Sequence, residues 1–331
     1  MTSAYRGASP RAIQRHYDVG NDFYALWLDT KTFCYSCAMW EPGDTLEAAQ
    51  LRKYEWHIAQ ARAHEASHVL DIGCGWGGLS RLLVDEHRVG HVVSLTLSNA
   101  QVEYIQALHH PRIEARLEGW AEHRPAAPYD AILAVGVLEH AARSGLSSRE
   151  KINAYRTFFQ HCHRMLKPGR WISGQTITYE TIGCVERVMG PTLWRWWPGG
   201  TVSIVSLGRR SVVFRRALSR LMKSLGGFHD GLDPFDALSL LDVFAESTLP
   251  RLAELSEATE GLFEIEMIRN DREDYRKTTQ EWHERLQARR TEAIALVGEA
   301  VTAYYERYLS TCVRVFESKA CGLVRFVLRR L

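Results

Sequence analysis

The sequence has no long apolar run and almost no excess of charge of either sign. Its longest apolar stretches fall well short of the roughly 20 residues that a membrane-spanning helix needs, so we expect no transmembrane segment. The N-terminal segment contains no apolar core, which argues against a secretory signal. With 41 Lys and Arg against 39 Asp and Glu, the net charge is +2. The sequence therefore lacks the basic excess of a protein whose whole surface binds nucleic acid, and we expect no nucleic-acid partner.

The cysteines do not show the spacing of a disulfide framework. Seven cysteines among 331 residues are an odd number without a repeated spacing, so we interpret them as reduced thiols of a cytoplasmic protein. Cys34 and Cys37 form an isolated pair with no second pair or suitably spaced histidine, so we expect no metal site. The composition, 46% hydrophobic and 24% charged, is that of a globular protein with one elaborated domain or two small ones.

The middle of the chain alternates strand and helix patterns. Five short apolar runs predict buried strands, at residues 68–72, 91–97, 113–117, 131–135 and 171–177. Three segments between them predict helices, at residues 79–87, 100–108 and 149–165. Lys167, Pro168 and Gly169 predict a turn. Strands that alternate with helices indicate an α/β fold, in which a mostly parallel twisted sheet carries helices on both faces.

The two ends of the chain flank this core of residues 67–179. We expect residues 1–66 to form a helical lid, in which a helix from Leu46 to Ala63 follows the N-cap Thr45. The aromatic, irregular stretch before that helix is typical of a segment that covers a site. We expect residues 248–331 to return to the core, with a strand at 263–268, helices over 272–319 and a last strand at 323–328. That last strand is expected at an antiparallel edge of the sheet.

Residues 180–247 break the alternation, and we interpret them as an inserted helical segment that covers the substrate. Between Arg187 and His229 there are eight Arg or Lys residues and no Asp or Glu. The basic segment 209–223 is most simply a solvated helix face. Alternatively it contacts a membrane surface, an acidic acyl carrier, or a phosphate or carboxylate of the substrate.

The motif DIGCGWGG, which begins at Asp71, is the most informative stretch of the chain. An apolar strand ends in a glycine turn before a helix, where the backbone can approach a ligand. Gly73, Gly75 and Gly78 fit the G-x-G-x-x-G template of dinucleotide sites, whereas Gly73, Gly75 and Gly77 fit the G-x-G-x-G of S-adenosylmethionine (SAM) methyltransferases. Asp71 favours SAM, because its carboxylate attracts the cationic amino-acid end of SAM and repels a pyrophosphate. The next predicted strand also ends in Ser-Leu-Thr, without the acidic residue that binds the ribose of a dinucleotide.

Further short motifs accompany this turn along the chain. They are HYDVGNDFY from His16, YSCA from Tyr35, LDIGCGWGG from Leu70, LTLS from Leu95 with Gln101, Glu139-His140, Gln175-Thr176-Ile177 and Tyr275. In this order they resemble the family of cyclopropane fatty-acid synthases and mycolic-acid cyclopropane synthases, which are SAM-dependent methyltransferases. The resemblance covers nearly the whole chain outside residues 183–240.

The resemblance implies a Rossmann-like class I methyltransferase fold that binds SAM and releases S-adenosylhomocysteine (SAH). It assigns eight residues to the cofactor: Tyr35 and Ser36 from the lid; Asp71, Gly73 and Gly75 at the methionine end; Thr96 and Gln101 at the ribose; and Trp120 at the adenine.

The resemblance also implies that a bound bicarbonate ion serves as general base beside the substrate. Its ligands correspond to the backbone of Cys37 and Ile177 and to the side chains of Glu139, Gln175 and Tyr275. Some members of the family carry His at the position of Gln175. An alkene acceptor becomes a carbocation when it is methylated, so a base must remove a proton while water is excluded.

Aromatic faces stabilise such a cation, and the lid offers four candidates, Tyr17, Phe23, Tyr24 and Trp40. With an amine or hydroxyl acceptor, Glu139 or His140 would orient or deprotonate the nucleophile instead. Three functions remain open. The first is methyl transfer to an alkene carbon of a hydrophobic acceptor (lipid, acyl, isoprenoid or polyketide-like). The second is N- or O-methylation of a small-molecule natural product, and the third is SAM-dependent binding or cyclisation of a hydrophobic ligand without methyl transfer. An oligomer also remains open.

Overall fold

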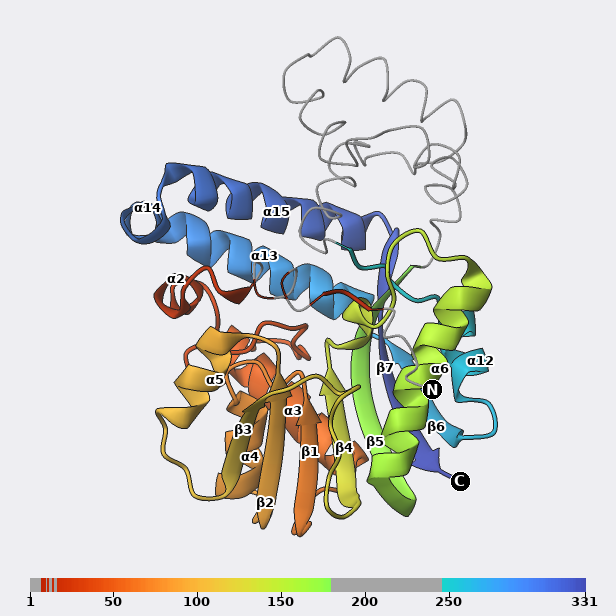
Figure 1. The fold of residues 1–331 in the computed structure, drawn as a ribbon. Helices are drawn as coiled ribbons and strands as arrows, with labels where there is room; N and C mark the ends of the chain where they lie inside the picture. The colour runs from red at the N-terminus through yellow and green to blue at the C-terminus, as the bar shows by residue number, and fades with distance from the viewer. Residues whose placement is uncertain (1–6, 10, 12–13, 15–16, 180–245) are drawn as a thin grey trace, which may run out of the picture.

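The computed structural model describes residues 7–9, 11, 14, 17–179 and 246–331. These residues contain a seven-stranded sheet of order β3-β2-β1-β4-β5-β7-β6 (Figure 1). The strands are β1 (His68–Ile72), β2 (His91–Thr96), β3 (Ile113–Leu117), β4 (Tyr129–Val135), β5 (Leu166–Tyr179), β6 (Phe263–Asn270) and β7 (Cys321–Arg330). The first five pair in parallel, while β7 is antiparallel to both β5 and β6. The strand order reverses between β1 and β4, which is where sheets of this kind bind ligands.

The five strands predicted in the middle of the chain are confirmed. β5 begins before the expected residue 171, but part of this extension leaves the ladder. Leu166 pairs with Tyr129 and Trp171 pairs with Ala131, so residues 167–170 loop out between them. Gly169 has φ +70° in this excursion, which accounts for the turn predicted at that place.

The expectation that the last strand lies at the edge of the sheet is wrong. β7 lies between β5 and β6, and its Arg325 is opposite Gln175 on one side and Arg269 on the other. β6 is the edge strand, and every residue after Phe263 in it is exposed. Residues 321–328 of β7 are all buried. A strand covered on both faces needs a nearly continuous apolar run, and CGLVRFVL is such a run.

Helices occur where the pattern predicts them, and the fold class is confirmed. They are α2 (Asn21–Ala25), α3 (Leu46–Gln60), α4 (Gly78–Asp85), α5 (Asn99–Gln106), α6 (Ser148–Met165), α12 (Leu252–Thr259), α13 (Arg272–Ala288), α14 (Arg290–Val297) and α15 (Glu299–Glu317). The predicted N-cap is present, because the Thr45 side chain accepts a hydrogen bond from the Ala48 N–H at 3.3 Å. Of these helices, none is long and apolar enough to cross a membrane.

The helices cover both faces of the sheet. Ile58 of α3 and Leu83 of α4 share a buried cluster with Val69 of β1. Phe158 of α6 lies in a second cluster with Leu70, the next residue of β1, and α12 packs against α6 on this face. Alternate residues of β1 thus point to opposite helical layers, as a doubly covered parallel sheet requires.

A further helical layer lies over the carboxyl ends of the parallel strands (Figure 1). It contains α2, α13, α14 and α15, and α13 packs along α15. Trp27, Trp282 and Tyr305 are almost fully buried in the cluster that joins this layer to the N-terminal segment. We call these four helices the cap. The cap and residues 17–40 together close the end of the sheet at which β1 and β4 diverge.

Candidate active site

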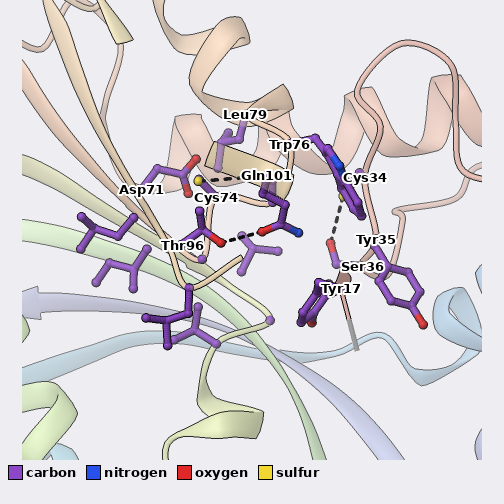
Figure 2. A pocket seen from close by; sticks show the side chains of 18 of the residues that line it. Tyr17, Cys34, Tyr35, Ser36, Asp71, Cys74, Trp76, Leu79, Thr96 and Gln101 are labelled. Carbon is purple, nitrogen blue, oxygen red and sulfur yellow. Dashed lines mark hydrogen bonds between the residues drawn. The ribbon is translucent and has the colours of Figure 1, made fainter. Parts of the chain in front are cut away.

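A cavity of about 960 Å³, including the part open to solvent, lies at the carboxyl ends of β1 to β4. Residues 33–36 line one side of it, and Figure 2 shows Cys34, Tyr35 and Ser36 on the side away from Asp71. All eight residues that the resemblance assigns to SAM line this one cavity, namely Tyr35, Ser36, Asp71, Gly73, Gly75, Thr96, Gln101 and Trp120. The structure brings these residues together, and their individual roles remain predictions.

The glycine turn makes room both for a ligand and for the lid. Gly73 and Gly75 adopt φ values of +74° and +55°, which side chains disfavour, and both line the cavity. Gly78 serves another purpose, because a Cβ there would lie 2.1 Å from the carbonyl oxygen of Thr32. The last glycine of the motif, Gly78, therefore lets α4 approach the loop that contains Thr32. The first two glycines, which both templates share, form the cavity wall.

Asp71, which lines the cavity, interacts electrostatically with the buried Lys53 behind the cavity wall. Asp71 is 1% exposed and its Oδ2 accepts a hydrogen bond from the Ser80 hydroxyl at 2.8 Å. Burial raises the pKa of Asp71 to about 7, although Ser80 and the positive charge of Lys53 oppose the rise. Lys53 is fully buried, and its Nζ donates to Cys34 Sγ at 2.7 Å and to Ser36 Oγ at 3.0 Å.

Sequence reasoning missed Lys53, although a pattern marks it. Lys53 lies on the buried stripe of α3, at helical spacing from Leu46, Ala49, Gln50 and His57. A lysine at a core position of an amphipathic helix is uncommon unless a partner holds it.

Residues at the ends of β2 and β3 form the part of the cavity to which the resemblance assigns the ribose and the adenine. The Thr96 hydroxyl donates to Gln101 Oε1 at 2.6 Å, so a ligand would meet the amide NH2 of Gln101. Trp120 is held edge-on to Phe158, with ring centroids 5.1 Å apart. Glu118 also lines the cavity, and it was not among the residues that the sequence predicted.

The predicted general-base residues gather beside this cavity. Glu139 lies in a short 3₁₀ helix, Leu138–His140, and is 4% exposed. Its Oε1 accepts the Ile177 N–H at 2.8 Å, whereas its Oε2 is buried without a hydrogen-bond partner among the described residues. Burial raises the pKa of Glu139 to about 7, against the opposing effect of the Ile177 amide. The carboxyl group therefore exchanges its proton near neutral pH.

Tyr275 and Cys37 lie near this carboxyl group. The pKa of the Tyr275 phenol is well above its usual range, first because of burial and then because of the nearby Cys37 and Glu139. The Tyr275 ring stacks on Phe316 of α15, with centroids 4.5 Å apart. Helix α13 of the cap thus places a protonated phenol, that of Tyr275, near the predicted base site.

A buried arginine joins the remaining predicted ligands, and sequence reasoning missed it. Arg325 of β7 is fully buried, and its Nε donates to Gln175 Oε1 at 2.9 Å. Its Nη2 donates to the carbonyl oxygens of Ala38 and Cys37, at 2.9 and 3.4 Å, and its Nη1 pairs with Asp271. Because Arg325 occupies the Gln175 oxygen, an anion would meet only the amide NH2 of Gln175. The sequence signal for Arg325 was its position as the single charged residue within the apolar run of β7.

Among the six predicted catalytic residues, only His140 lines the cavity itself. Burial lowers its pKa to about 4, so the ring is neutral near pH 7, and Nδ1 lies 3.2 Å from the Ser247 hydroxyl. Of the four aromatic candidates, Tyr17 lines the cavity, whereas Phe23 and Tyr24 are buried in the cap cluster. The Trp40 indole N–H donates to the Thr278 hydroxyl at 3.0 Å.

Other predictions concern cysteine, metal and the basic segment. The six cysteines among the described residues are free and buried. Within the same residues, no three His, Cys, Asp or Glu side chains are grouped as metal ligands. Residues 180–245, which include the basic segment 209–223 and most of the predicted insertion, lie outside the described residues.

Comparisons with known proteins agree along nearly the whole chain. The family model for mycolic acid cyclopropane synthetase matches residues 6–326. Cyclopropane mycolic acid synthase 2 of Mycobacterium bovis is 29% identical over 325 residues, which cover 96% of this chain and 93% of that protein. The solved structure of the cyclopropane synthase MmaA2 from Mycobacterium tuberculosis superposes with a TM-score of 0.74 at 26% identity, covering 98% of this chain and 99% of that one. Mycolic acid cyclopropane synthase CmaA1, solved as a complex with SAH and CTAB, gives 0.73 at 25% identity, with coverage of 98% and 99%.

Proposed function

The chain belongs to the mycolic acid cyclopropane synthetase family, and we propose that it transfers a methyl group from SAM to an alkene carbon of a hydrophobic acceptor. Membership makes it a SAM-dependent methyltransferase. One observation carries the finer proposal. The cavity that gathers all eight cofactor residues adjoins a buried carboxyl group, Glu139, which has an oxygen without a partner.

The cavity suits SAM in shape and charge. SAM supplies an electrophilic methyl group on a sulfonium centre when it is bound. Asp71 faces the cationic amino group, and the backbone at Gly73 and Gly75 leaves space for the methionine chain. Gln101 offers its amide to the ribose, and Trp120 offers an apolar wall to the adenine. Such positioning is the main contribution that a protein makes to a displacement of this kind.

The residues around Glu139 also fit a bicarbonate ion, which would supply a proton acceptor beside the substrate. At neutral pH a large fraction of Glu139 is protonated, because its pKa is about 7. Its Oε2 then carries a proton, and an anion in the site would accept it more strongly than the neutral Thr176 hydroxyl that also acts on this carboxyl group. The Tyr275 phenol stays protonated and gives a second donor. The Ile177 N–H already donates to Glu139, so we assign Ile177 to orienting this carboxyl group rather than to holding the ion directly.

The class of acceptor follows from the relatives and from the cap. The relative from Mycobacterium bovis and one of the solved structures are named for cyclopropane synthesis on mycolic acids. In this chain the cap packs a dense layer of aromatic side chains, including Trp282 and Tyr305, over the end of the sheet. Such a layer excludes water, which would otherwise convert a carbocation into an alcohol.

A labelled methyl group tests the proposal directly. Full-length protein is incubated with SAM carrying a ¹³C methyl group and with three acceptors: vesicles of dioleoyl phosphatidylglycerol, the oleoyl thioester of N-acetylcysteamine, and phenethylamine. NMR of the products then identifies the atom that bears the label. Label in a cyclopropane, methyl or methylene group on an acyl chain supports the proposal. Label on the amine nitrogen alone would replace it with N-methylation.

The ion is tested separately by removing it. In buffer freed of carbon dioxide, we expect transfer to slow at least about tenfold and to recover on addition of sodium bicarbonate, as the loss of a positioned base predicts. An unchanged rate would exclude bicarbonate as the base and leave the methyl transfer itself in place.

A further inference from the structure

Lys53 is a buried positive charge without a negative partner. Its exposure is zero, and among the described residues no carboxylate lies within ion-pair distance of Nζ. The chain contains a contrasting case in Lys151, which is 2% exposed and lies 3.1 Å from the Glu254 carboxylate. A buried ammonium group is costly to leave unpaired. Lys53 therefore differs from Lys151 in having no carboxylate in contact with it among the described residues.

The contacts of Lys53 lead into the cavity. Nζ donates to Cys34 Sγ and Ser36 Oγ, and both of these residues line the cavity, as does Tyr54, whose ring centroid is 3.9 Å from Nζ. In Figure 2 Cys34 and Ser36 lie on the lid side of the cavity and Asp71 lies on the sheet side. The positive charge of Lys53 is also felt by Asp71, whose pKa it lowers against the effect of burial.

The hydrogen bonds fix the direction in which Ser36 can donate. Because Lys53 donates to Ser36 Oγ, the hydroxyl proton of Ser36 must point elsewhere. It is directed either to Cys34 Sγ, 3.1 Å away, or to a ligand in the cavity. A ligand oxygen with a negative charge is the stronger acceptor of the two.

We propose that Lys53, acting through Ser36, recognises the carboxylate of the cofactor's amino-acid end, while Asp71 recognises its ammonium group. This inference rests on the proposed function, because it concerns the cofactor of that reaction. The amino-acid end of SAM is a zwitterion. Asp71 lines the cavity, whereas Lys53 lies behind its wall and donates a hydrogen bond to the lining residue Ser36. Lys53 is a positioning residue in this scheme, and it makes the site selective for adenosyl compounds that carry a carboxylate.

The competing account is that Cys34 itself is the counter-ion. Its sulfur lies 2.7 Å from Nζ, so a thiolate there would neutralise Lys53 without any ligand. In that case the lysine would not distinguish ligands with and without a carboxylate.

Calorimetric titration of the full chain with two ligands separates these accounts. One is SAH, and the other is S-adenosyl-3-thiopropylamine, which keeps the amine and lacks the carboxylate. We expect the wild type to prefer SAH by at least about thirtyfold, in line with a charged hydrogen bond in a buried site. Lys53→Met should weaken the binding of SAH by a similar factor and should change the binding of the amine by no more than about threefold.

Matched variants complete the test. Lys151→Met combined with Glu254→Gln removes a buried ion pair elsewhere and should leave the ligand preference intact, and Cys34→Ser should also retain it. If Lys53→Met does not fold, Ser36→Ala tests the same contact and should weaken SAH selectively by about tenfold. A wild type that binds SAH and the amine equally well, or equal weakening of the binding of both ligands by Lys53→Met, would overturn the inference. A wild type that binds neither ligand would instead overturn the proposed function.

Discussion

Replacing Glu139 with Gln changes one ionisable proton and almost nothing in shape. Glu139 is 4% exposed, and its Oε1 accepts the Ile177 N–H at 2.8 Å. Gln can keep an oxygen at that position and place its NH2 group where Oε2 lies. The variant should therefore fold and bind SAH within about threefold of the wild type. It cannot pass a proton to or from the base site, so we expect methyl transfer to fall about a hundredfold.

The same substitution has a stability signature with a definite sign. Burial raises the pKa of Glu139 from 4.5 to about 7, so the folded state holds this proton more tightly than the unfolded state. The resulting stabilisation is complete below pH 4.5 and is lost as the pH rises to about 7, because only the unfolded state ionises in that range. A pKa shift of this size corresponds to about 3 kcal/mol. Gln cannot ionise, so Glu139→Gln should gain about 3 kcal/mol relative to the wild type between pH 4.5 and pH 8.

Urea unfolding in buffer free of carbon dioxide measures this gain. The free energies of unfolding of both proteins are compared at pH 5 and pH 8, so that every other titrating group, Asp71 included, cancels. Transfer of the labelled methyl group is counted on the same protein preparations after addition of sodium bicarbonate. A parallel pH dependence in the two proteins would refute the reasoning about burial. A wild-type rate of transfer in the variant would refute the role of Glu139 at the base site.

Three further substitutions test other parts of the site. Tyr275→Phe keeps the stack on Phe316 and removes one hydrogen-bond donor. The affinity for SAH should therefore persist, while the counted methyl transfer should fall at least about tenfold. An undiminished rate of transfer would count against this donor. The pKa of Asp71 is about 7, so titrations should show wild-type SAH affinity rising up to about tenfold from pH 6 to pH 8 as the carboxylate ionises. Asp71→Asn should bind SAH weakly, with an affinity that does not change between pH 6 and pH 8. The same pH dependence as in the wild type would disprove the contact between Asp71 and the ligand. Arg325→Met removes the buried partner of Asp271, which keeps the half-exposed Arg269 at 2.7 Å, and it also removes the donor to Gln175. The substitution should lower the free energy of unfolding in urea by about 1–3 kcal/mol; an unchanged or raised free energy would contradict this.

The cofactor half of the site was predictable because its residues are local to strand ends. Asp71, Gly73 and Gly75 surround the end of one predicted strand, and Thr96 ends the next. Parallel neighbouring strands bring their carboxyl ends together, so residues at two neighbouring strand ends suffice to place a common cavity. The resemblance to a family supplied the roles of these residues, which the spacing alone did not.

The base site and the buried charges depend on contacts between distant parts of the chain. Arg325 reaches Ala38 and Gln175 only because β7, the last strand, inserts beside β5. Patterns of hydrophobicity give the type of an element but not its neighbour, which is why the last strand was wrongly expected at the edge. The burial of Lys53 was not predicted for a related reason, since a lysine is expected at the surface until its partners are known.

Calorimetric titration of the wild-type chain with SAH, SAM and NAD tests the central claim most directly, because the glycine turn fits two templates and the account commits to one. We predict one site per chain that binds SAH and SAM and gives no heat with NAD. Correctly folded protein that gives no heat with SAH or SAM, or that binds NAD instead, would contradict it.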